Sequence, residues 1–173
     1  LIGADGAHSQ VRQAMGIGSS GWQYQQLAMG ITILLDKPVK PITWQQFTPQ
    51  GPRAFLPMFG NYGSLVWYDN PDVLANLSKL NNAQLSSEIM NAFPLELTAD
   101  GNGFTIVDKA VFPLTRAHAS EYIRGNCVLI GDAAHTINPL AGQGVNLGFK
   151  DVEALLAVSA QYTALSSHDF RAA

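Results

Sequence analysis

Two short stretches of the 173-residue chain hold residue types whose spacing could do chemistry. The longer one, from Gly131 to Asn146, reads Gly-Asp-Ala-Ala-His-Thr-Ile-Asn-Pro-Leu-Ala-Gly-Gln-Gly-Val-Asn. Asp132 follows an apolar run, and a carboxylate at the end of a buried strand can accept hydrogen bonds from sugar or polyol hydroxyls. Gly142 and Gly144 leave bare amides at a predicted helix start, which would stabilise a ligand ring that becomes anionic during turnover. Alternatively, the glycines only permit a tight strand–turn–helix connection.

The second stretch, from Gly3 to Arg12, reads Gly-Ala-Asp-Gly-Ala-His-Ser-Gln-Val-Arg. Asp5 follows a predicted strand end and can therefore face a cofactor crevice. Ser9 is placed to cap a helix, and Arg12 can pair with Asp5 or meet a pyrophosphate. The alternative is a capping turn with a surface salt bridge and no role in binding.

Composition excludes several other kinds of chemistry. The net charge is −3 with no basic run, so we do not expect a nucleic-acid partner. Cys127 is the single cysteine, and the four histidines lack metal-ligand spacing, so we expect no metal. His135 is predicted to be a structural hydrogen-bonding residue. Neither Gly-x-Ser-x-Gly nor His-Glu-x-x-His occurs, and no apolar run reaches the roughly 18 residues of a membrane span.

The two stretches lie in flanking segments of α/β character. Residues 1–4 predict a strand tail, residues 9–15 a short helix, and the wholly apolar residues 127–130 a strand covered on both faces. Residues 145–160 predict a helix whose apolar stripe consists of Val145, Phe149, Val152 and Leu156. The simplest arrangement places both flanks in one parallel-type layer.

The middle of the chain predicts an antiparallel meander with two helices. The expected strands span residues 27–35, 43–47, 53–59, 64–68 and 105–112, and the expected helices span residues 72–80 and 83–93. We therefore expect an α/β protein, α+β within this chain, with a substrate-binding antiparallel sheet inserted into a Rossmann-type domain. The predicted parts are residues 1–21, 22–112 and 113–173.

The two stretches resemble the second and third fingerprints of the class A flavoprotein aromatic hydroxylases, the para-hydroxybenzoate hydroxylase type. Gly-Ala-Asp-Gly-x-x-Ser-x-Val-Arg matches at 3–12, Gly-Asp-Ala-Ala-His-x-x-x-Pro-x-x-Gly-Gln-Gly-x-Asn matches at 131–146, and Asp151 completes a downstream acidic position. Within that family, residues 44–49, 51–57 and 65–68 resemble the ubiquinone-biosynthesis hydroxylases.

The resemblance implies an FAD site and a substrate pocket. Asp132 would bind the ribityl chain, Pro139 and Gly144 would line the flavin ring, and the helix-start amides would lie near its pyrimidine edge. The implied cofactor-binding residues are Asp5, Arg12, Gly131, Asp132, Pro139, Gly142, Gln143, Gly144, Val145 and Asn146. Apolar and cationic side chains of the middle segment would contact the substrate, namely Trp44, Phe47, Arg53, Phe55 and Trp67.

The implied activity is hydroxylation of the benzoquinol ring of a polyprenylated ubiquinone precursor. In the family, NAD(P)H reduces FAD, and O2 then forms a flavin C4a-hydroperoxide that transfers oxygen to the ring. The implied location is the bacterial cytoplasm, with peripheral contact at the inner membrane and association with a ubiquinone-biosynthesis complex as further expectations. One alternative is a non-catalytic quinone-binding or scaffold component of that complex, and another is a flavin dehydrogenase or halogenase that shares the cofactor domain.

The ends of the chain predict a fragment. It opens at Leu1 without a Met or a signal peptide, and it lacks the family's first fingerprint, Gly-x-Gly-x-x-Gly. The family's C-terminal helices are missing as well. On this basis we expect the isolated chain to be inactive and colourless.

Overall fold

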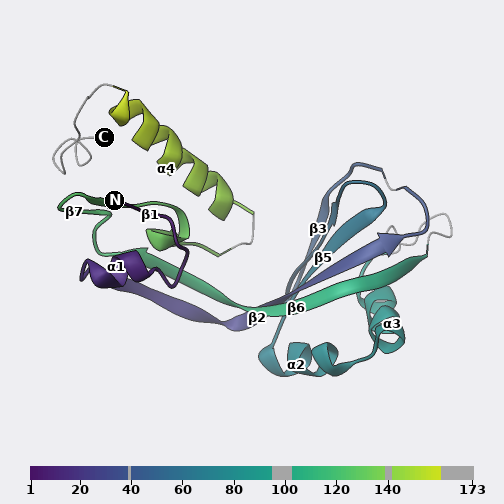
Figure 1. Ribbon diagram of the computed structural model, residues 1–173. Helices are drawn as coiled ribbons and strands as arrows, with labels where there is room; N and C mark the ends of the chain where they lie inside the picture. Colours follow the sequence, from purple (N-terminus) through teal and green to yellow (C-terminus); the bar gives the residue numbers. More distant parts are fainter. Residues whose placement is uncertain (39, 95–102, 139–141, 161–173) are drawn as a thin grey trace. The chain divides into compact units, whose positions relative to one another are not determined.

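The computed structural model describes residues 1–38, 40–94, 103–138 and 142–160 (Figure 1). The chain divides into two compact units, Leu1–Gln23 with Thr115–Ala173, and Tyr24–Leu114. Two long strands, β2 (Ser19–Leu35) and β6 (Phe104–Ala119), run from one unit into the other. Within the described ranges, no helix has the length and apolar character needed to cross a membrane.

The first unit is built around a small sheet of mixed direction. Strand β1 (Ile2–Gly3) pairs in parallel with β8 (Cys127–Leu129), which pairs antiparallel with β7 (Ile123–Arg124). All three residues of β8 are buried, which confirms the predicted doubly covered strand and the parallel layer. Around it lie α1 (Gln10–Ala14), a 3-10 turn (Gly131–Ala133), β9 (His135–Thr136) and α4 (Gly144–Ser159).

The second unit is an antiparallel sheet covered on one face by two helices. The sheet order is β3-β4-β5-β2-β6, and β9 extends it beyond β6. The further elements are β3 (Trp44–Thr48), β4 (Gly51–Pro57), β5 (Tyr62–Asp69), α2 (Pro71–Lys79) and α3 (Asn82–Ala92). Buried residues of α2 and α3, among them Leu74, Leu85 and Ile89, pack with Met29, Ile31 and Leu65 of the sheet. The predicted meander and both predicted helices are confirmed.

Strand register decides which side chains face the helices. Trp44 pairs with Phe55, Phe55 with Leu65, and all three belong to the core under α2 and α3. One residue further along, Ala54 pairs with Val66 and Val66 with Gly30. Because side chains alternate across a strand, this second row lies on the opposite face. We call that opposite side the open face.

Two strands are longer than predicted. The structure begins β2 at Ser19 rather than at residue 27, and continues β6 to Ala119 rather than 112. The extra residues of β2 are mostly polar and show no apolar alternation. They are held in place by a tertiary contact, since a Cβ built at Gly21 would meet the carbonyl oxygen of Arg116 at 2.1 Å. Pairing between segments distant in sequence overrides local propensity here.

Helix α4 spans the predicted residues but turns a different face inward. The predicted apolar stripe is exposed in the described structure, with Val145 at 68% and Phe149 at 67%. Gly148 instead approaches the backbone of Gly131, where a Cβ would lie 3.5 Å from the Gly131 Cα. Asp151, one turn later, is hydrogen-bonded to the same residue. A small residue and a polar contact therefore decide the helix orientation, which a hydrophobic pattern cannot reveal.

Candidate cofactor site

Asp132 is presented to solvent on the tight turn that follows β8. Gly131 opens this turn with φ +59°, a left-handed conformation that other residues rarely adopt. The Asp132 side chain is exposed, and its carboxylate has no hydrogen-bond partner among the described residues. Only its backbone carbonyl is used, accepting a 3.4 Å contact from the Thr136 hydroxyl. The carboxylate is thus free to accept hydrogen bonds from a ligand.

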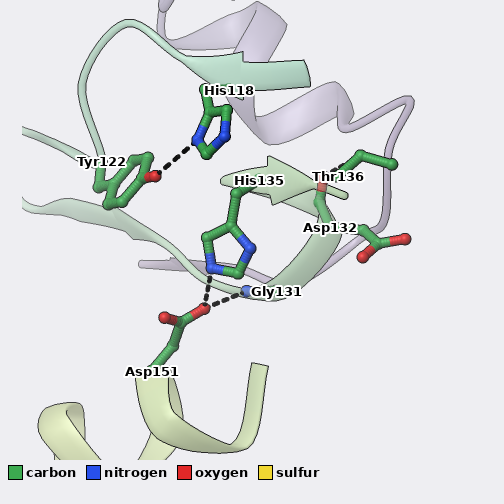
Figure 2. Close-up of polar contacts among 7 residues, drawn as sticks. All are labelled: His118, Tyr122, Gly131, Asp132, His135, Thr136 and Asp151. Carbon is green, nitrogen blue, oxygen red and sulfur yellow. Dashed lines mark hydrogen bonds and ion pairs between the residues drawn. The ribbon is translucent and has the colours of Figure 1, made fainter. Parts of the chain in front are cut away.

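The same turn is fastened to helix α4 by Asp151 (Figure 2). One carboxylate oxygen, Oδ2, accepts from the Gly131 amide at 2.7 Å and contacts His135 Nε2 at 2.7 Å. His135 is only 7% exposed, and its Nδ1 is buried without a partner in the described structure. Geometry therefore assigns the ring proton to Nε2, because a buried Nδ1–H would lose its hydrogen bond. The predicted structural role of His135 is confirmed.

Two further ring side chains surround His135. The Tyr122 hydroxyl lies 3.2 Å from His118 Nδ1, and the Tyr122 ring centroid lies 5.9 Å from that of His135 (Figure 2). Burial raises the pKa of Tyr122, and the negative charge of Asp151 raises it further. Sequence reasoning missed His118 and Tyr122, because strand register brings His118 to the site and the turn after β6 brings Tyr122. His118 pairs with His135 where β6 meets β9.

Arg12 links the two chemistry-bearing stretches. Its Nη1 donates to the carbonyl of Ala133 at 2.8 Å, and its Nη2 donates to the carbonyl of Ala7 at 2.8 Å. The expected salt bridge with Asp5 is not formed in the described structure. Arg12 therefore gives the turn that carries Asp132 a second attachment besides Asp151, and its guanidinium is already used within the chain.

Asp5 caps helix α1. Its carboxylate accepts from the Ser9 hydroxyl and from the amides of Gln10 and Val11, at 2.7 and 3.1 Å. The Ser9 hydrogen bond is the main cause that lowers the pKa of Asp5, and desolvation opposes it. The capping interpretation is thus confirmed, and contact of Asp5 with the cofactor region stays a prediction.

Replacing Arg12 with Ala should destabilise the fold by about 1.5–3 kcal/mol, chiefly because the carbonyl of the buried Ala133 loses its charged donor. Chemical denaturation of the protein without FAD measures this change. Lys150→Ala, an exposed cation on α4, is the matched control. Equal unfolding midpoints for the two variants would show that the Arg12 contacts contribute nothing.

The start of α4 has no side-chain cap among the described residues. Gly142 has φ +62°, and Gln143, the residue before the helix, makes no side-chain hydrogen bond to it. Val145 and Asn146 in the first turn are exposed. These four residues, with Gly144, fit a ligand that carries or develops negative charge. Pro139, the remaining predicted ring contact, lies outside the described residues.

The predicted substrate residues divide between the two faces of the sheet. Phe55 and Trp67 are 4% exposed and belong to the core under the helices, and Trp44 packs against them. Arg53 lies on the same side, donating to the Ala92 carbonyl at 2.8 Å and stacking 5.0 Å from the Trp67 ring centroid. Phe47 is 73% exposed. Strand register thus places Trp44, Phe55 and Trp67 in or against the core, with Arg53 on the same side of the sheet. Contact of these residues with a substrate stays a prediction.

Comparison with known proteins identifies the class to which this fold and site belong. The model of the FAD binding domain family matches residues 1–162, and the chain belongs to that family. It is 54% identical over 159 residues to 3-demethoxyubiquinol 3-hydroxylase of Escherichia coli, covering 91% of this chain and 39% of that protein. It is 35% identical over 186 residues to the human ubiquinone biosynthesis monooxygenase COQ6, covering 90% of this chain and 40% of that protein.

Solved structures share the same fold. A ternary complex of aklavinone-11 hydroxylase with FAD and aklavinone matches with a TM-score of 0.73 at 25% identity, covering 93% of this chain and 31% of that one. A mutant of PqsL from Pseudomonas aeruginosa matches with a TM-score of 0.80 at 23% identity, covering 98% of this chain and 48% of that one. The chain spans about two fifths of the length of the curated relatives named above.

Proposed function

We propose that the protein is an FAD-dependent monooxygenase that hydroxylates the benzoquinol ring of a polyprenylated ubiquinone precursor, with NAD(P)H and O2 as co-substrates. The observation that carries the proposal is the exposed Asp132 carboxylate, which has no hydrogen-bond partner among the described residues and lies on a turn joined to α4 by Asp151. The names of the relatives support the substrate class. Within the family, residues 44–49, 51–57 and 65–68 resemble the ubiquinone-biosynthesis hydroxylases, 2-octaprenyl-3-methyl-6-methoxy-1,4-benzoquinol hydroxylase in particular.

We call the turn that carries Asp132, together with the start of α4, the corner. The residues of the corner fit FAD. Asp132 would accept hydrogen bonds from the ribityl hydroxyls, since nothing in the described chain competes for its carboxylate. The amides of Gly144, Val145 and Asn146 would face the pyrimidine edge of the ring, where negative charge develops on reduction. When bound, FAD would accept hydride from the reduced nicotinamide and activate O2, and the protein supplies position and charge.

Among the described side chains of the corner, none is placed to act as a nucleophile. His135 is buried and donates to Asp151, so it helps to fix the turn to α4 and does not face the substrate. A benzoquinol ring is already electron-rich, so its hydroxylation needs no strong protein base. The task of these residues is to hold the Asp132 turn and the helix start in fixed positions.

The open face of the sheet suits an aromatic substrate. Gly30, Ala54 and Val66 form a row of small side chains there. A Cβ built at Gly30 would lie 3.1 Å from the Phe112 ring, which places Phe112 on this face beside the row. Tyr68, also on the open face, is buried, and burial raises the pKa of its hydroxyl. The hydroxyl therefore stays protonated at neutral pH and can donate to a quinol oxygen.

Replacing Gly144 with Val should lower FAD binding at least tenfold without unfolding the protein. A Cβ at this position meets only Ile137 at 3.8 Å, an ordinary contact, so the fold has room for the side chain. The added methyl groups would occupy the space beside the helix-start amides. Flavin fluorescence titration and the melting temperature without FAD measure the two effects. If Gly144→Val bound flavin with wild-type affinity, the flavin ring could not lie beside the helix-start amides.

Product analysis with labelled oxygen tests the proposed activity. The intact protein, NAD(P)H, 18O2 and a short-tail benzoquinol should give a product that carries one labelled hydroxyl. Oxidation of the quinol without label would indicate a dehydrogenase. Quinol binding without NAD(P)H consumption would favour the non-catalytic quinone-binding or scaffold component.

A further inference from the structure

The hairpin between β4 and β5 exposes large apolar side chains at its tip. Phe59 is 98% exposed, and Met58 beside it is 51% exposed. The hairpin is closed, because the Met58 amide donates to the Tyr62 carbonyl at 2.8 Å. Phe59 contributes nothing to the core, and together with the adjacent Met58 it forms an exposed apolar patch, the kind of feature that marks an interaction site.

Neighbouring segments reach the same end of the sheet. Tyr62 pairs with Leu34, and the Leu35 amide donates to the Asn61 carbonyl at 2.9 Å, so the end of β2 lies beside the tip. Strand β3 begins at this end too, because its first residue, Trp44, pairs with Phe55 near the end of β4. The described residues of the β2–β3 connection, among them Lys37, Lys40 and Ile42, therefore lie at this end. We call Lys37, Lys40, Ile42, Met58, Phe59 and Tyr62 the hairpin end.

The charge of this region differs from that of the whole chain. Residues 37–68 include Lys37, Lys40 and Arg53 but no Asp or Glu, whereas the complete chain has 13 acidic and 10 basic residues. Both lysines belong to the hairpin end and are exposed. The acidic neighbour Asp36 lies against Gly103, where a Cβ would meet its Oδ2 at 2.4 Å. Apolar and cationic side chains thus occur together on a chain of net negative charge.

We infer that the hairpin end docks on an anionic phospholipid bilayer. Phe59 and Met58 would enter the acyl boundary, the amphipathic Tyr62 would lie at headgroup level, and the lysines would face anionic headgroups. A hairpin tip fits lipid better than a protein partner, because stable protein interfaces bury about 800 Å² on each side. The inference rests on the proposed function in one respect, since a polyprenylated substrate resides in the bilayer.

Sedimentation of the intact protein with sucrose-loaded vesicles tests this inference. Phosphatidylcholine vesicles containing phosphatidylglycerol should bind the protein more tightly than phosphatidylcholine alone. Phe59→Ser should weaken binding about tenfold and Met58→Ser severalfold, the losses expected for withdrawing these side chains from an apolar phase. Met90→Ser on α3 is the matched control for Met58→Ser, since Met90 is 47% exposed. It should leave vesicle binding unchanged.

Three outcomes would overturn the inference. The first is equal vesicle binding by Phe59→Ser and Met90→Ser, and the second is that the wild type binds no vesicle. The third is that Phe59→Ser still binds vesicles but no longer binds a second protein that the wild type binds. The last would identify a protein-docking surface. Phe59→Ser should keep its FAD and its turnover of a short-tail quinol in solution. Failure of the proposed function would appear separately, as absence of that turnover in the wild type.

Discussion

Asp132→Ala should lose its FAD during purification, with affinity reduced about 10- to 100-fold. The carboxylate would provide charge-assisted hydrogen bonds to ligand hydroxyls, and each such bond contributes about 1.5–3 kcal/mol. Because the Asp132 carboxylate makes no hydrogen bond or ion pair with a described residue of the chain, its removal should leave the stability of the protein without FAD unchanged. This separation between binding and stability distinguishes a ligand contact from a structural one. Flavin fluorescence titration and denaturation without FAD measure the two quantities.

Two controls sharpen the Asp132 experiment. Asp132→Asn keeps an acceptor oxygen at the same place and should retain part of the affinity. Glu153→Gln removes a negative charge from an exposed position on α4 and should change neither affinity nor stability. Full flavin occupancy in Asp132→Ala would refute the ribityl assignment. A large loss of stability without FAD would instead make Asp132 a structural residue.

Asp151→Ala should destabilise the protein by about 3–4 kcal/mol, a large share of the roughly 5–15 kcal/mol that holds a typical domain. The substitution leaves two donors without an acceptor, the Gly131 amide and the Nε2–H of the buried His135. FAD affinity should fall as well, since Gly131 opens the turn that carries Asp132. Chemical denaturation of the protein without FAD measures the first effect, and flavin titration measures the second.

Asp151→Asn separates the charge of Asp151 from its acceptor geometry. An amide oxygen can still accept from Gly131 and His135, so we expect a loss smaller than for Asp151→Ala. The pKa of Tyr122 should move down towards its ordinary value, because the Asp151 charge raises it, while the part due to burial remains. Ultraviolet titration of the tyrosines follows this shift. If Asp151→Ala unfolds at the same midpoint as Glu153→Gln, the hydrogen bonds of Asp151 to Gly131 and His135 contribute nothing to stability.

The chemistry of the corner could be predicted from the sequence better than its geometry. The acidic residue after a buried strand, followed by glycines at a helix start, is a local pattern, and local patterns survive folding. Contacts of Arg12 with Ala133 and of Asp151 with His135 join residues far apart in the sequence, where no local signal exists. The same limit explains why the exposed side of α4 could not be predicted.

Strand positions were predictable, but strand register was not. Trp67 and Val66 are adjacent apolar residues in the same strand, and only pairing with β2 and β4 decides which one faces the helices. A preference for aromatic residues in a substrate pocket selected Trp67, yet Trp67 packs in the core. Small residues of the open face, such as Ala54, carry no signal of their own in a sequence. Their role becomes visible once the register is known.

A crystal structure of the intact protein with bound FAD tests the flavin placement most directly. We predict a ribityl hydroxyl at hydrogen-bond distance from the Asp132 carboxylate, about 2.5–2.8 Å. The pyrimidine edge of the flavin should face the amides of Gly144 and Val145. A corner filled by other protein segments, or a flavin ring held elsewhere while Asp132 faces solvent, would contradict the account.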